Sequence, residues 1–531
     1  MGDVNKMNLL ANREYPLYNI REFNSFYELL KDNACYNPSE IAFGWWENKK
    51  IYKETTYLEF YTHVLNTVAM LQEKHYKGEH IGIIGENSYY WIVLYLAIII
   101  SGNICVVLDK DMPEKEFYEI IDDMDVSIIY TDDYIDYTID DKCAKVCKFE
   151  EIEKIVDENV YIFDTNTIIP YKHKKDELAC IFLTSGTTGK RKGVMLSENN
   201  MIYLLYNASK LFNPEGNMLA VLPFHHSFGL ITTLFGAVYS KVVYISKGLR
   251  YIPKEMEVTK PTCIFVVPLF IESFSKKINK SIKDNNKEKQ FAFIKNISNL
   301  LLKCHIDMRR KIFKKILTPF GGNLKILVSG GAALNDKYAE EFKNYGINIL
   351  SGYGTTECSP VISVDRNYYH KGVGLPVPGT EVKIENNEVI VHGENVMLGY
   401  YKNEEETDKV LKDGWYYTGD IGYIDEDGFV FLNGRIKNLI ILSNGENVSP
   451  EELENEISLI EDIEEVVVYA ENNVITAEIY SEKLNEDVKQ KIKNQINEYN
   501  KTLENYKRIN NIVFRETPFD KTTSKKIIRK R

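Results

Sequence analysis

The chain has 531 residues, of which 44% are hydrophobic, which is enough to bury a large core and to form more than one domain. Its net charge of −12 argues against nucleic-acid binding as the main task, because proteins with that task present a basic surface. No apolar signal segment follows Met1, and none of the eight cysteines forms a CxxC pair, so we expect a cytoplasmic protein.

Short β-branched runs alternate with longer amphipathic stretches in the first half of the chain. The runs predicted as strands are residues 80–85, 104–108, 126–130, 219–222, 242–245 and 263–267. This alternation predicts an α/β fold, with layered, mostly parallel sheets and helices in a large N-terminal domain. The apolar run from Trp91 to Leu108 approaches the length of a membrane span, but Gly102 and Asn103 divide it. We therefore expect a buried helix followed by a buried strand there.

The sequence TSGTTGKRKG, from Thr184 to Gly193, directly follows the apolar run 178–183 and predicts a mobile phosphate-binding loop at the end of a buried strand. The residues that supply hydroxyl groups, close backbone approach and positive charge are Thr184, Ser185, Gly186, Thr187, Thr188, Gly189, Lys190, Arg191 and Lys192. The spacing differs from that of the Walker loop. An ordinary surface connection is the alternative interpretation. Ser197 is expected to cap the helix that carries the loop.

The pattern changes in the second half of the chain. Residues 381–434 show short alternating strands separated by turns, which predicts a small β subdomain. After Arg435, a helix near 451–460, strands near 466–470 and 474–480, and a charged helix near 487–506 predict a compact α+β unit.

Further short motifs follow the loop in a fixed order. They are GGAA from Gly330, SGYGTTEC from Ser351, YTGD from Tyr417, GRIKNLI from Gly434, SNGENVSPEELE from Ser443 and KTTSKK from Lys521. Each motif alone is weak. Together, from about Phe23 to the end, they resemble the acyl-adenylate-forming (AMP-binding) superfamily, and SNGENVSPEELE most resembles the long-chain fatty acyl-CoA synthetases.

The resemblance implies a division into an N-terminal domain that binds AMP and the acyl group, residues 1–436, and a small mobile C-terminal α+β domain, residues 437–531, with its hinge at Lys437. It also implies a nucleotide site. The loop from Thr184 to Lys192 would hold the β- and γ-phosphates, Thr356 the α-phosphate, and Glu357 with Thr188 a Mg²⁺ ion. The residues placed around the adenine, the ribose and the pocket floor are Tyr353, Gly354, Asp420, Arg435, Gly330, Gly331 and Ala332. An ordinary turn residue is the alternative interpretation of Asp420.

The segment LPFHHSFGL, from Leu222, resembles the acid-pocket motif of the family and places His226 at the gate between the acyl and thiol channels. A core histidine is the alternative. His225 receives no role from the resemblance. The motif contains no Asp, which amino-acid-activating relatives use to hold the substrate ammonium. Gly445 would let the pantetheine arm of coenzyme A pass close to the backbone, and Ile441 stands where many short-chain and aryl relatives have a lysine.

The resulting hypothesis is an enzyme that uses ATP and Mg²⁺ to adenylate a medium- or long-chain fatty acid and passes the acyl group to coenzyme A. An acyl or aryl acid ligase that loads an acyl carrier protein supplied in trans is the first alternative. A non-catalytic nucleotide-binding scaffold is a remote one, as is a luciferase-type oxygenase, which shares the first step.

Residues 276–315 contain thirteen Lys and Arg but only three Asp and Glu, with apolar residues at helical spacing. We hypothesise that this segment contacts an anionic membrane, where fatty acids partition, so that the cytoplasmic protein is peripheral to the inner membrane face. A solvated helical hairpin is the alternative.

The resemblance assigns the role of the adenylation lysine to Lys526. Lys525 stands where the family usually has a glycine, so Lys525 stays a second candidate. A solvated basic terminus is the alternative for this tail. The Lys526 ammonium would bridge the acid carboxylate and the α-phosphate. We predict that Lys526→Ala costs about 3 kcal/mol or more in acid-dependent exchange of pyrophosphate into ATP. Unchanged exchange in Lys526→Ala, with loss in Lys525→Ala, would move the role to Lys525.

Overall fold

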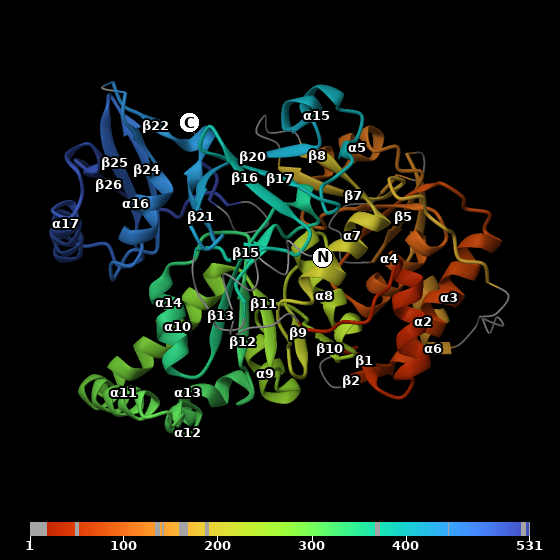
Figure 1. Cartoon of the computed structure of the whole chain (residues 1–531), viewed down its shortest axis with the longest axis horizontal. Coiled ribbons are helices and arrows are strands. Elements are labelled where there is room, and N and C mark those ends of the chain that lie inside the picture. Colours follow the sequence, from red (N-terminus) through yellow and green to blue (C-terminus); the bar gives the residue numbers. More distant parts are fainter. Residues whose placement is uncertain are drawn as a thin grey trace.

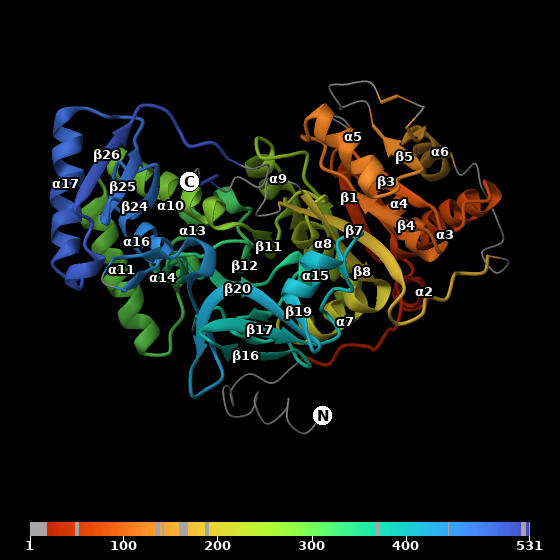
Figure 2. The same ribbon diagram turned by 90° about the horizontal axis from the view of Figure 1, so that it is seen from above.

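The computed structural model describes residues 18–47, 52–132, 139–140, 143–158, 168–185, 191–366, 372–443, 445–521 and 527–529. Within these ranges, two large sheets with their helices form the main body, and the residues after 436 form a separate lobe at one end of it (Figure 1). A view at right angles shows the same separation (Figure 2). The mixed α/β architecture predicted from the sequence is confirmed.

The first sheet contains nine strands, and those in its centre run parallel. In spatial order they are β15 (Leu375–Pro376), β14 (Ser363–Val364), β13 (Asn348–Tyr353), β12 (Ile326–Ser329), β11 (Cys263–Val266), β9 (Met218–Ala220), β10 (Val243–Ile245), β1 (Ile41–Trp46) and β2 (Tyr52–Thr56). Because β11, β12 and β13 are parallel neighbours, the loops after them meet at one edge of the sheet, where doubly wound folds place their ligands.

The second sheet contains seven strands. In spatial order they are β18 (Gly399–Tyr400), β8 (Arg191–Ser197), β7 (Leu178–Ser185), β4 (Ile104–Val107), β3 (His80–Ile84), β5 (Ile128–Thr131) and β6 (Lys145–Lys148). β3 to β7 run parallel, whereas β8 is antiparallel to both β7 and β18. The strands predicted in the first half of the chain all form, with ends that differ by at most two residues.

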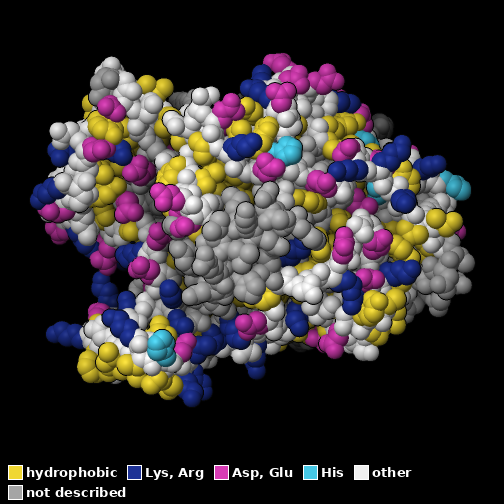
Figure 3. All heavy atoms as spheres, in the orientation of Figure 1, with side chains coloured by type: hydrophobic (Ala, Val, Ile, Leu, Met, Phe, Trp, Pro, Cys, Tyr) yellow, Lys and Arg dark blue, Asp and Glu magenta, His cyan; other side chains and the backbone are white. Residues whose placement is uncertain are grey.

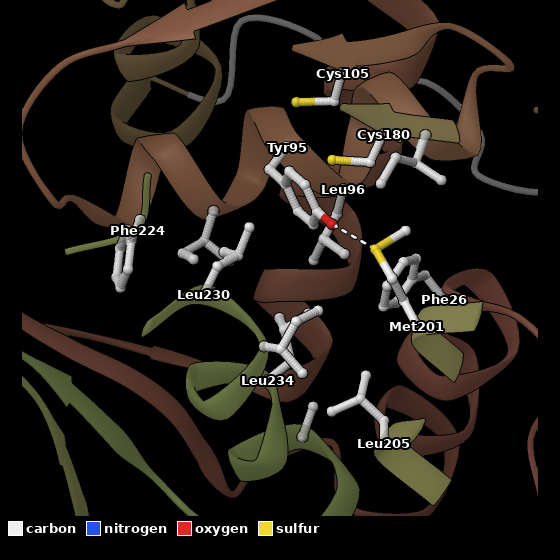
Figure 4. Packing of buried hydrophobic residues seen from close by; sticks show 14 of the residues in the cluster. Phe26, Tyr95, Leu96, Cys105, Cys180, Met201, Leu205, Phe224, Leu230 and Leu234 are labelled. Atoms are coloured by element: carbon white, nitrogen blue, oxygen red, sulfur yellow. Dashed lines mark hydrogen bonds between the residues drawn. The ribbon is translucent and has the colours of Figure 1, made fainter. Parts of the chain in front are cut away.

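Helices pack on and between these sheets. They are α2 (Phe26–Tyr36), α3 (Tyr57–Glu73), α4 (Tyr89–Ile100), α5 (Glu114–Asp123), α6 (Glu150–Glu158), α7 (Glu198–Ala208), α8 (Ser227–Tyr239), α9 (Ile252–Thr259) and α14 (Asp336–Asn344). One cluster of buried side chains draws on both sheets and on α4, α7 and α8. Figure 4 shows Tyr95 of α4 against Met201 of α7, with its hydroxyl 3.1 Å from the sulfur, and Leu230 and Leu234 of α8 beside them.

The apolar run from Trp91 to Leu108 divides as predicted. Its first half belongs to α4, which begins after Ser88, whose side chain accepts a hydrogen bond from the Trp91 amide, and its second half contains β4. All residues of α4 from Trp91 onward are at most 2% exposed. This helix is therefore a core helix. In the part of the chain that the structure describes, no helix has both the length and the apolar composition to cross a membrane.

The prediction that a helix directly carries the phosphate loop is wrong, because strand β8 lies between them. β7 and β8 form an antiparallel pair from Leu178–Ser197 to Ser185–Arg191, so the loop joins two paired strands. The residues between, 186–190, lie outside the described residues. Ser197 does begin α7, and its side chain and that of Asn200 cap each other's backbone amides as expected. The sequence RKGVMLS pairs with β7 because its apolar residues continue the buried sheet.

A third sheet corresponds to the predicted β subdomain. Its strands are β16 (Glu381–Glu385), β17 (Glu388–His392), β20 (Trp415–Ile424), β19 (Leu411–Lys412) and β21 (Val430–Arg435). The short helix α15 (Glu404–Val410) precedes β19 and lies beside β8 and β18. The 3₁₀ turn η3 (Ile436–Asn438) leads out of β21 into the terminal lobe.

The terminal lobe has its own buried cluster of apolar side chains. Its elements are β22 (Ile440–Ile441), β23 (Asn447–Val448), α16 (Pro450–Ile457), β24 (Glu465–Glu471), β25 (Val474–Tyr480), α17 (Glu486–Asn500), η4 (Asn505–Lys507) and β26 (Asn511–Arg515). An independent core allows a unit to move as a rigid body. The boundary at residue 436 stays a prediction.

The basic segment forms helices that project from the body below the terminal lobe (Figure 1). They are α10 (Pro268–Asp284), α11 (Glu288–Lys303), α12 (Arg309–Ile312), α13 (Lys314–Leu317) and η1 (Thr318–Phe320). Part of the positive charge faces the terminal lobe. The ammonium groups of Lys276 and Lys283 lie 3.0 Å from Glu464 and 2.8 Å from Glu461, respectively.

The chain passes very close to itself just after β13. A Cβ atom at Gly354 would lie 1.9 Å from the carbonyl oxygen of Pro360, whereas one at Gly352 would have no neighbour nearer than 3.7 Å. We predict that Gly354→Ala lowers the free energy of unfolding by about 1–3 kcal/mol, because the backbone must move apart. Gly352→Ala is the matched control and should change it by less than about 1 kcal/mol. Urea denaturation measures both, and equal effects would contradict the close approach.

Candidate functional site

A cavity of about 890 Å³ lies at the edge of the first sheet where β11, β12 and β13 end. The start of α8, the end of β7 and the strand β20 complete its wall. Most of the residues singled out from the sequence line this one cavity: Thr184, Lys192, His226, Gly330, Gly331, Tyr353, Gly354, Thr356, Glu357, Arg435 and Lys437. The fold thus brings together motifs that are up to 253 residues apart, from Thr184 to Lys437.

Some of the singled-out residues do not line the cavity. Ala332 is exposed, and Gly445, with φ of +85°, lies in the turn between β22 and β23. Gly186, Thr187, Thr188, Gly189 and Lys526 lie outside the described residues, as does the side chain of Ser185. The roles proposed for all of these residues stay predictions.

Asp420 connects two of the lining residues. Its Oδ2 accepts a hydrogen bond of 2.7 Å from the Tyr353 hydroxyl, and its Oδ1 lies 2.8 Å from the Nε of Arg435. The pairing of β20 with β21 sets Asp420 opposite Arg435. Asp420 is only 4% exposed, whereas the Arg435 side chain is 46% exposed, so the pair is buried on its carboxylate side. Burial, reinforced by the charge of Asp420, raises the pKa of Tyr353 well above its usual value, so the phenol remains a donor.

Oxygen atoms also gather on the 3₁₀ turn η2 (Thr356–Cys358), which follows β13. The Thr356 hydroxyl lies 3.0 Å from that of Ser227 at the start of α8, and Glu357 Oε1 accepts a 2.9 Å hydrogen bond from Tyr400. The Lys192 ammonium lies 4.7 Å from the centre of the Tyr400 ring. A cation, two hydroxyl groups and a carboxylate therefore share one corner of the cavity. Such a set can bind an anion together with a divalent cation.

The residues at this corner suit Mg²⁺. This ion prefers hard oxygen ligands and is usually held by one or two carboxylates plus phosphate oxygens of a substrate. Glu357 supplies the carboxylate within the cavity. Among the described residues, no three His, Cys, Asp or Glu side chains form a metal site of their own. The geometry therefore fits a metal that arrives with a phosphate-bearing substrate.

Two histidines lie side by side where the cavity narrows at the start of α8. The ring centres of His225 and His226 are 4.3 Å apart, and His226 is the residue that precedes the helix. His225 Nε2 lies 3.5 Å from a carboxylate oxygen of Asp109. Burial nevertheless lowers the pKa of His225, which outweighs the opposite effect of Asp109, so the imidazole is neutral near pH 7.

Part of the cavity wall is apolar and is called the apolar branch below. We define it by the lining residues Ala208, Phe212, Phe228, Thr232, Phe235 and Phe265. The rings of Phe212, Phe235 and Phe265 lie 5.8 Å from one another, and those of Phe235 and Phe265 are nearly parallel, with an angle of 11°. Ala208, the last residue of α7, is buried beside them. No carboxylate belongs to this set of described residues, so the branch suits a hydrocarbon group.

Several lining residues escaped the sequence analysis. Tyr400 and the α15 residues Glu406 and Lys409 border the cavity next to Lys192. The acidic start of α15 could be recognised in the sequence as a helix N-terminus, but its position beside β8 depends on the pairing of β18 with β8. That pairing joins residues about 200 positions apart, and no local sequence pattern predicts it.

Comparisons with known proteins agree with this geometry. A family model described as AMP-binding enzyme matches residues 30–401, and one described as AMP-binding enzyme C-terminal domain matches residues 437–531. The long-chain-fatty-acid–CoA ligase FadD15 of Mycobacterium bovis is 27% identical over 414 residues, covering 72% of this chain and 69% of that protein. The long-chain-fatty-acid–CoA ligase 5 of Rattus norvegicus is 26% identical over 519 residues, covering 87% and 75%.

Solved structures share the fold. The o-succinylbenzoate CoA synthetase MenE of Bacillus subtilis, in complex with its acyl-adenylate intermediate, has a TM-score of 0.74 at 20% identity and covers 94% of this chain and 96% of that one. ATP-bound MatB of Rhodopseudomonas palustris has a TM-score of 0.73 at 20% identity, covering 94% and 97%. The family model spans more than half of the chain, from the strands before the phosphate loop to β18. The chain therefore belongs to the AMP-binding enzyme family, which confirms the superfamily that its motifs resemble.

Proposed function

We propose that this protein activates a medium- or long-chain fatty acid with ATP and transfers the acyl group to coenzyme A, releasing AMP and pyrophosphate. Its class is that of the AMP-forming acid–CoA ligases, which use ATP, Mg²⁺ and coenzyme A. The observation that carries the fatty-acid proposal is the lining of the cavity. Lys192, Thr356 and Glu357 share its wall with the apolar branch, which is lined by aromatic rings.

Formation of an acyl-adenylate requires the acid carboxylate to attack the α-phosphorus of ATP while pyrophosphate leaves. The protein contributes mainly position and charge, as in phosphoryl transfer generally. In this proposal Thr356 donates its hydroxyl to an α-phosphate oxygen, and Lys192 with the loop after Thr184 holds the β- and γ-phosphates. Glu357 would hold Mg²⁺, which neutralises phosphate charge when bound. Tyr400 keeps the Glu357 carboxylate in place by its hydrogen bond.

The adenosine part would lie against Tyr353 and Gly354, with the ribose toward Asp420 and Arg435. Both carboxylate oxygens of Asp420 are already hydrogen bonded, to Tyr353 and to Arg435. A carboxylate oxygen can accept more than one hydrogen bond, so the ribose hydroxyls can be accepted without breaking these contacts. Tyr353 and Arg435 thus hold the Asp420 carboxylate in position before the nucleotide binds.

The terminal lobe would supply Lys526 for the first step. The described residues on either side of it are held within that lobe: Lys521 lies 2.5 Å from Glu465, and Arg529 pairs with Glu454. Neither Lys521 nor Arg529 lines the cavity in this arrangement. We propose that the lobe pivots at Lys437, which lies at the cavity wall, to bring Lys526 in for adenylation. A second pivot would then bring Gly445 toward the site for the thioester step.

The thiol of coenzyme A must reach the carbonyl of the acyl-adenylate, displace AMP and give its proton to solvent or to a base. His226, which lines the cavity directly before α8, is proposed to gate this entry. The convergence of Lys192, Thr356 and Glu357 on one cavity favours a catalyst over a non-catalytic scaffold. A carrier-protein thiol in place of coenzyme A remains the principal alternative acceptor.

Acids of graded length test the substrate proposal. We predict that pyrophosphate release with coenzyme A rises with chain length for saturated acids and is at least about tenfold weaker with aryl and short acids, because burial of each CH₂ contributes about 0.8 kcal/mol. Ala208→Leu should shift the preference to shorter acids by filling the end of the apolar branch, whereas Ala208→Ser, of nearly equal size, should not. A flat response across all acids would contradict the proposal. A higher thioester yield with phosphopantetheinylated carrier protein than with coenzyme A would identify the carrier protein as the acyl acceptor.

A second proposal concerns the membrane. Phe293, Ile297 and Leu300 are spaced along one side of α11 and are 66%, 41% and 63% exposed, with exposed Lys289 and Lys303 near both ends of this stripe. Figure 3 shows hydrophobic and basic side chains together on the projecting lobe that contains α11. An apolar stripe bordered by lysines matches an anionic lipid surface. We propose that this stripe contacts the membrane in which the fatty acid partitions.

Vesicle flotation at low salt tests this contact. We predict that the protein floats with vesicles containing anionic phosphatidylserine but not with purely zwitterionic ones, and that Phe293→Glu with Leu300→Glu reduces the floating fraction at least about threefold. Leu58→Glu, at an exposed leucine on α3, is the matched control and should float normally. Absence of flotation with anionic vesicles at low salt would end the membrane proposal and leave the acid-ligase proposal intact.

A further inference from the structure

Helix α15 carries two charged side chains that the roles described so far do not use. Glu406 and Lys409 both line the cavity beside Lys192. They come from a different part of the chain than the phosphate loop, and the antiparallel pairing of β18 with β8 brings them to it. Figures 1 and 2 both show α15 next to β8.

The three charged groups form one chain of contacts. The Lys192 ammonium pairs with Glu406 Oε2, and the Lys409 ammonium donates a 2.7 Å hydrogen bond to Glu406 Oε1. Each oxygen of a single carboxylate is thus occupied by a different ammonium group. The side chain of Lys192 is 12% exposed and that of Glu406 is 23% exposed, so this pair is considerably drier than an ordinary surface ion pair. The side chain of Lys409 is 54% exposed, and its ammonium also contacts Glu405 at 2.8 Å.

This arrangement resembles an anion site that is filled by a side chain. The two ammonium groups hold the pKa of Glu406 down to about 2, so the carboxylate is charged at any working pH. A terminal phosphate offers three oxygens and more negative charge than a carboxylate, so it can take over both ammonium contacts. Lysine suits this exchange because its ammonium is a compact charge on a flexible stem. The corner with Glu357 and Thr356 lies next to it, since Lys192 also covers the Tyr400 ring.

We propose that Lys409 is a second phosphate-binding lysine, which together with Lys192 holds the β- and γ-phosphates of ATP, and that Glu406 occupies this position until the triphosphate displaces it. The proposal rests on ATP being the substrate, and it does not depend on which acid is activated. Displaced Glu406 then turns toward solvent, to which its own side chain is already 23% exposed and that of Lys409 54% exposed. Pyrophosphate leaves from the same two lysines, and the returning carboxylate competes with it and favours its release.

Calorimetric titration of the full chain with magnesium ATP, magnesium pyrophosphate and AMP separates this role from a structural one, because AMP lacks the β- and γ-phosphates. We predict that Lys409→Gln weakens the binding of ATP and pyrophosphate about tenfold, or about 1.4 kcal/mol, and leaves that of AMP within twofold. Lys409→Arg, which keeps the charge, should retain most of the affinity. Glu406→Gln should tighten the binding of ATP severalfold, since the competing charge is gone.

Lys402→Gln is the matched control. Lys402 lies just before α15, pairs with Asp125 at 2.6 Å and does not line the cavity, so all three affinities should stay within twofold. An unchanged affinity for ATP and pyrophosphate in Lys409→Gln, or an equal loss for AMP, would overturn the phosphate role. Weaker ATP binding in Glu406→Gln would contradict the proposal that ATP displaces the Glu406 carboxylate. Normal nucleotide binding in the wild type without acid-dependent turnover would contradict the acid-ligase proposal alone.

Discussion

The antiparallel ladder of β7, β8 and β18 is the constraint on which the site depends. It fixes Thr184 at the end of one strand, Lys192 opposite it in the next, and Tyr400 in the third. The Tyr400 hydroxyl donates a hydrogen bond to Glu357, which lies in the turn η2 after β13 of the other large sheet. The backbone ladder therefore fixes the strand positions of Lys192 and Tyr400, and the Tyr400 hydroxyl in turn holds the Glu357 carboxylate. Such preorganisation is what electrostatic catalysis requires, because the groups need not be rearranged when charge develops.

The two ends of the cavity follow from two different physical rules. Charged and hydroxyl-bearing residues gather where strands end, because backbone groups and loops there are free to meet a ligand. The apolar branch lies instead between α7, α8 and β11, where the aromatic side chains of the core leave space that continues into the cavity. A molecule with a phosphate at one end and a hydrocarbon at the other satisfies both. The proposed acyl-adenylate would use both kinds of lining, because it carries a phosphate and a hydrocarbon group.

Sequence patterns predicted the elements that are determined locally. The strand before the loop, the capped start of α7 and the division of the apolar run at Gly102 and Asn103 all depend on neighbouring residues, and all are present. β8 pairs with the adjacent β7, but its second partner, β18, is about 200 residues away, so the position of α15 beside β8 was missed. Glu406 and Lys409 were missed for the same reason, since nothing in EEETDKV distinguishes a cavity wall from a solvated helix face. Conversely, the motif residues Thr356, Glu357 and Tyr353 were found only because the series of motifs resembles a family, and no spacing rule links them to Thr184.

The ion pairs between the terminal lobe and the body are weaker than the packing inside the lobe. Lys276 and Lys283 meet Glu464 and Glu461 at the surface, with side chains that are 39–66% exposed, and such pairs contribute only about 0–1 kcal/mol each. Within the lobe, by contrast, a cluster of buried apolar residues from β24, β25, α16 and α17 holds the elements together. The proposed rotation of the whole lobe about the short connection at 436–438 would break these surface ion pairs. It would keep the apolar packing inside the lobe. Because Arg435 is fixed to Asp420 just before this connection, the proposed rotation can leave Asp420 and Tyr353 in place.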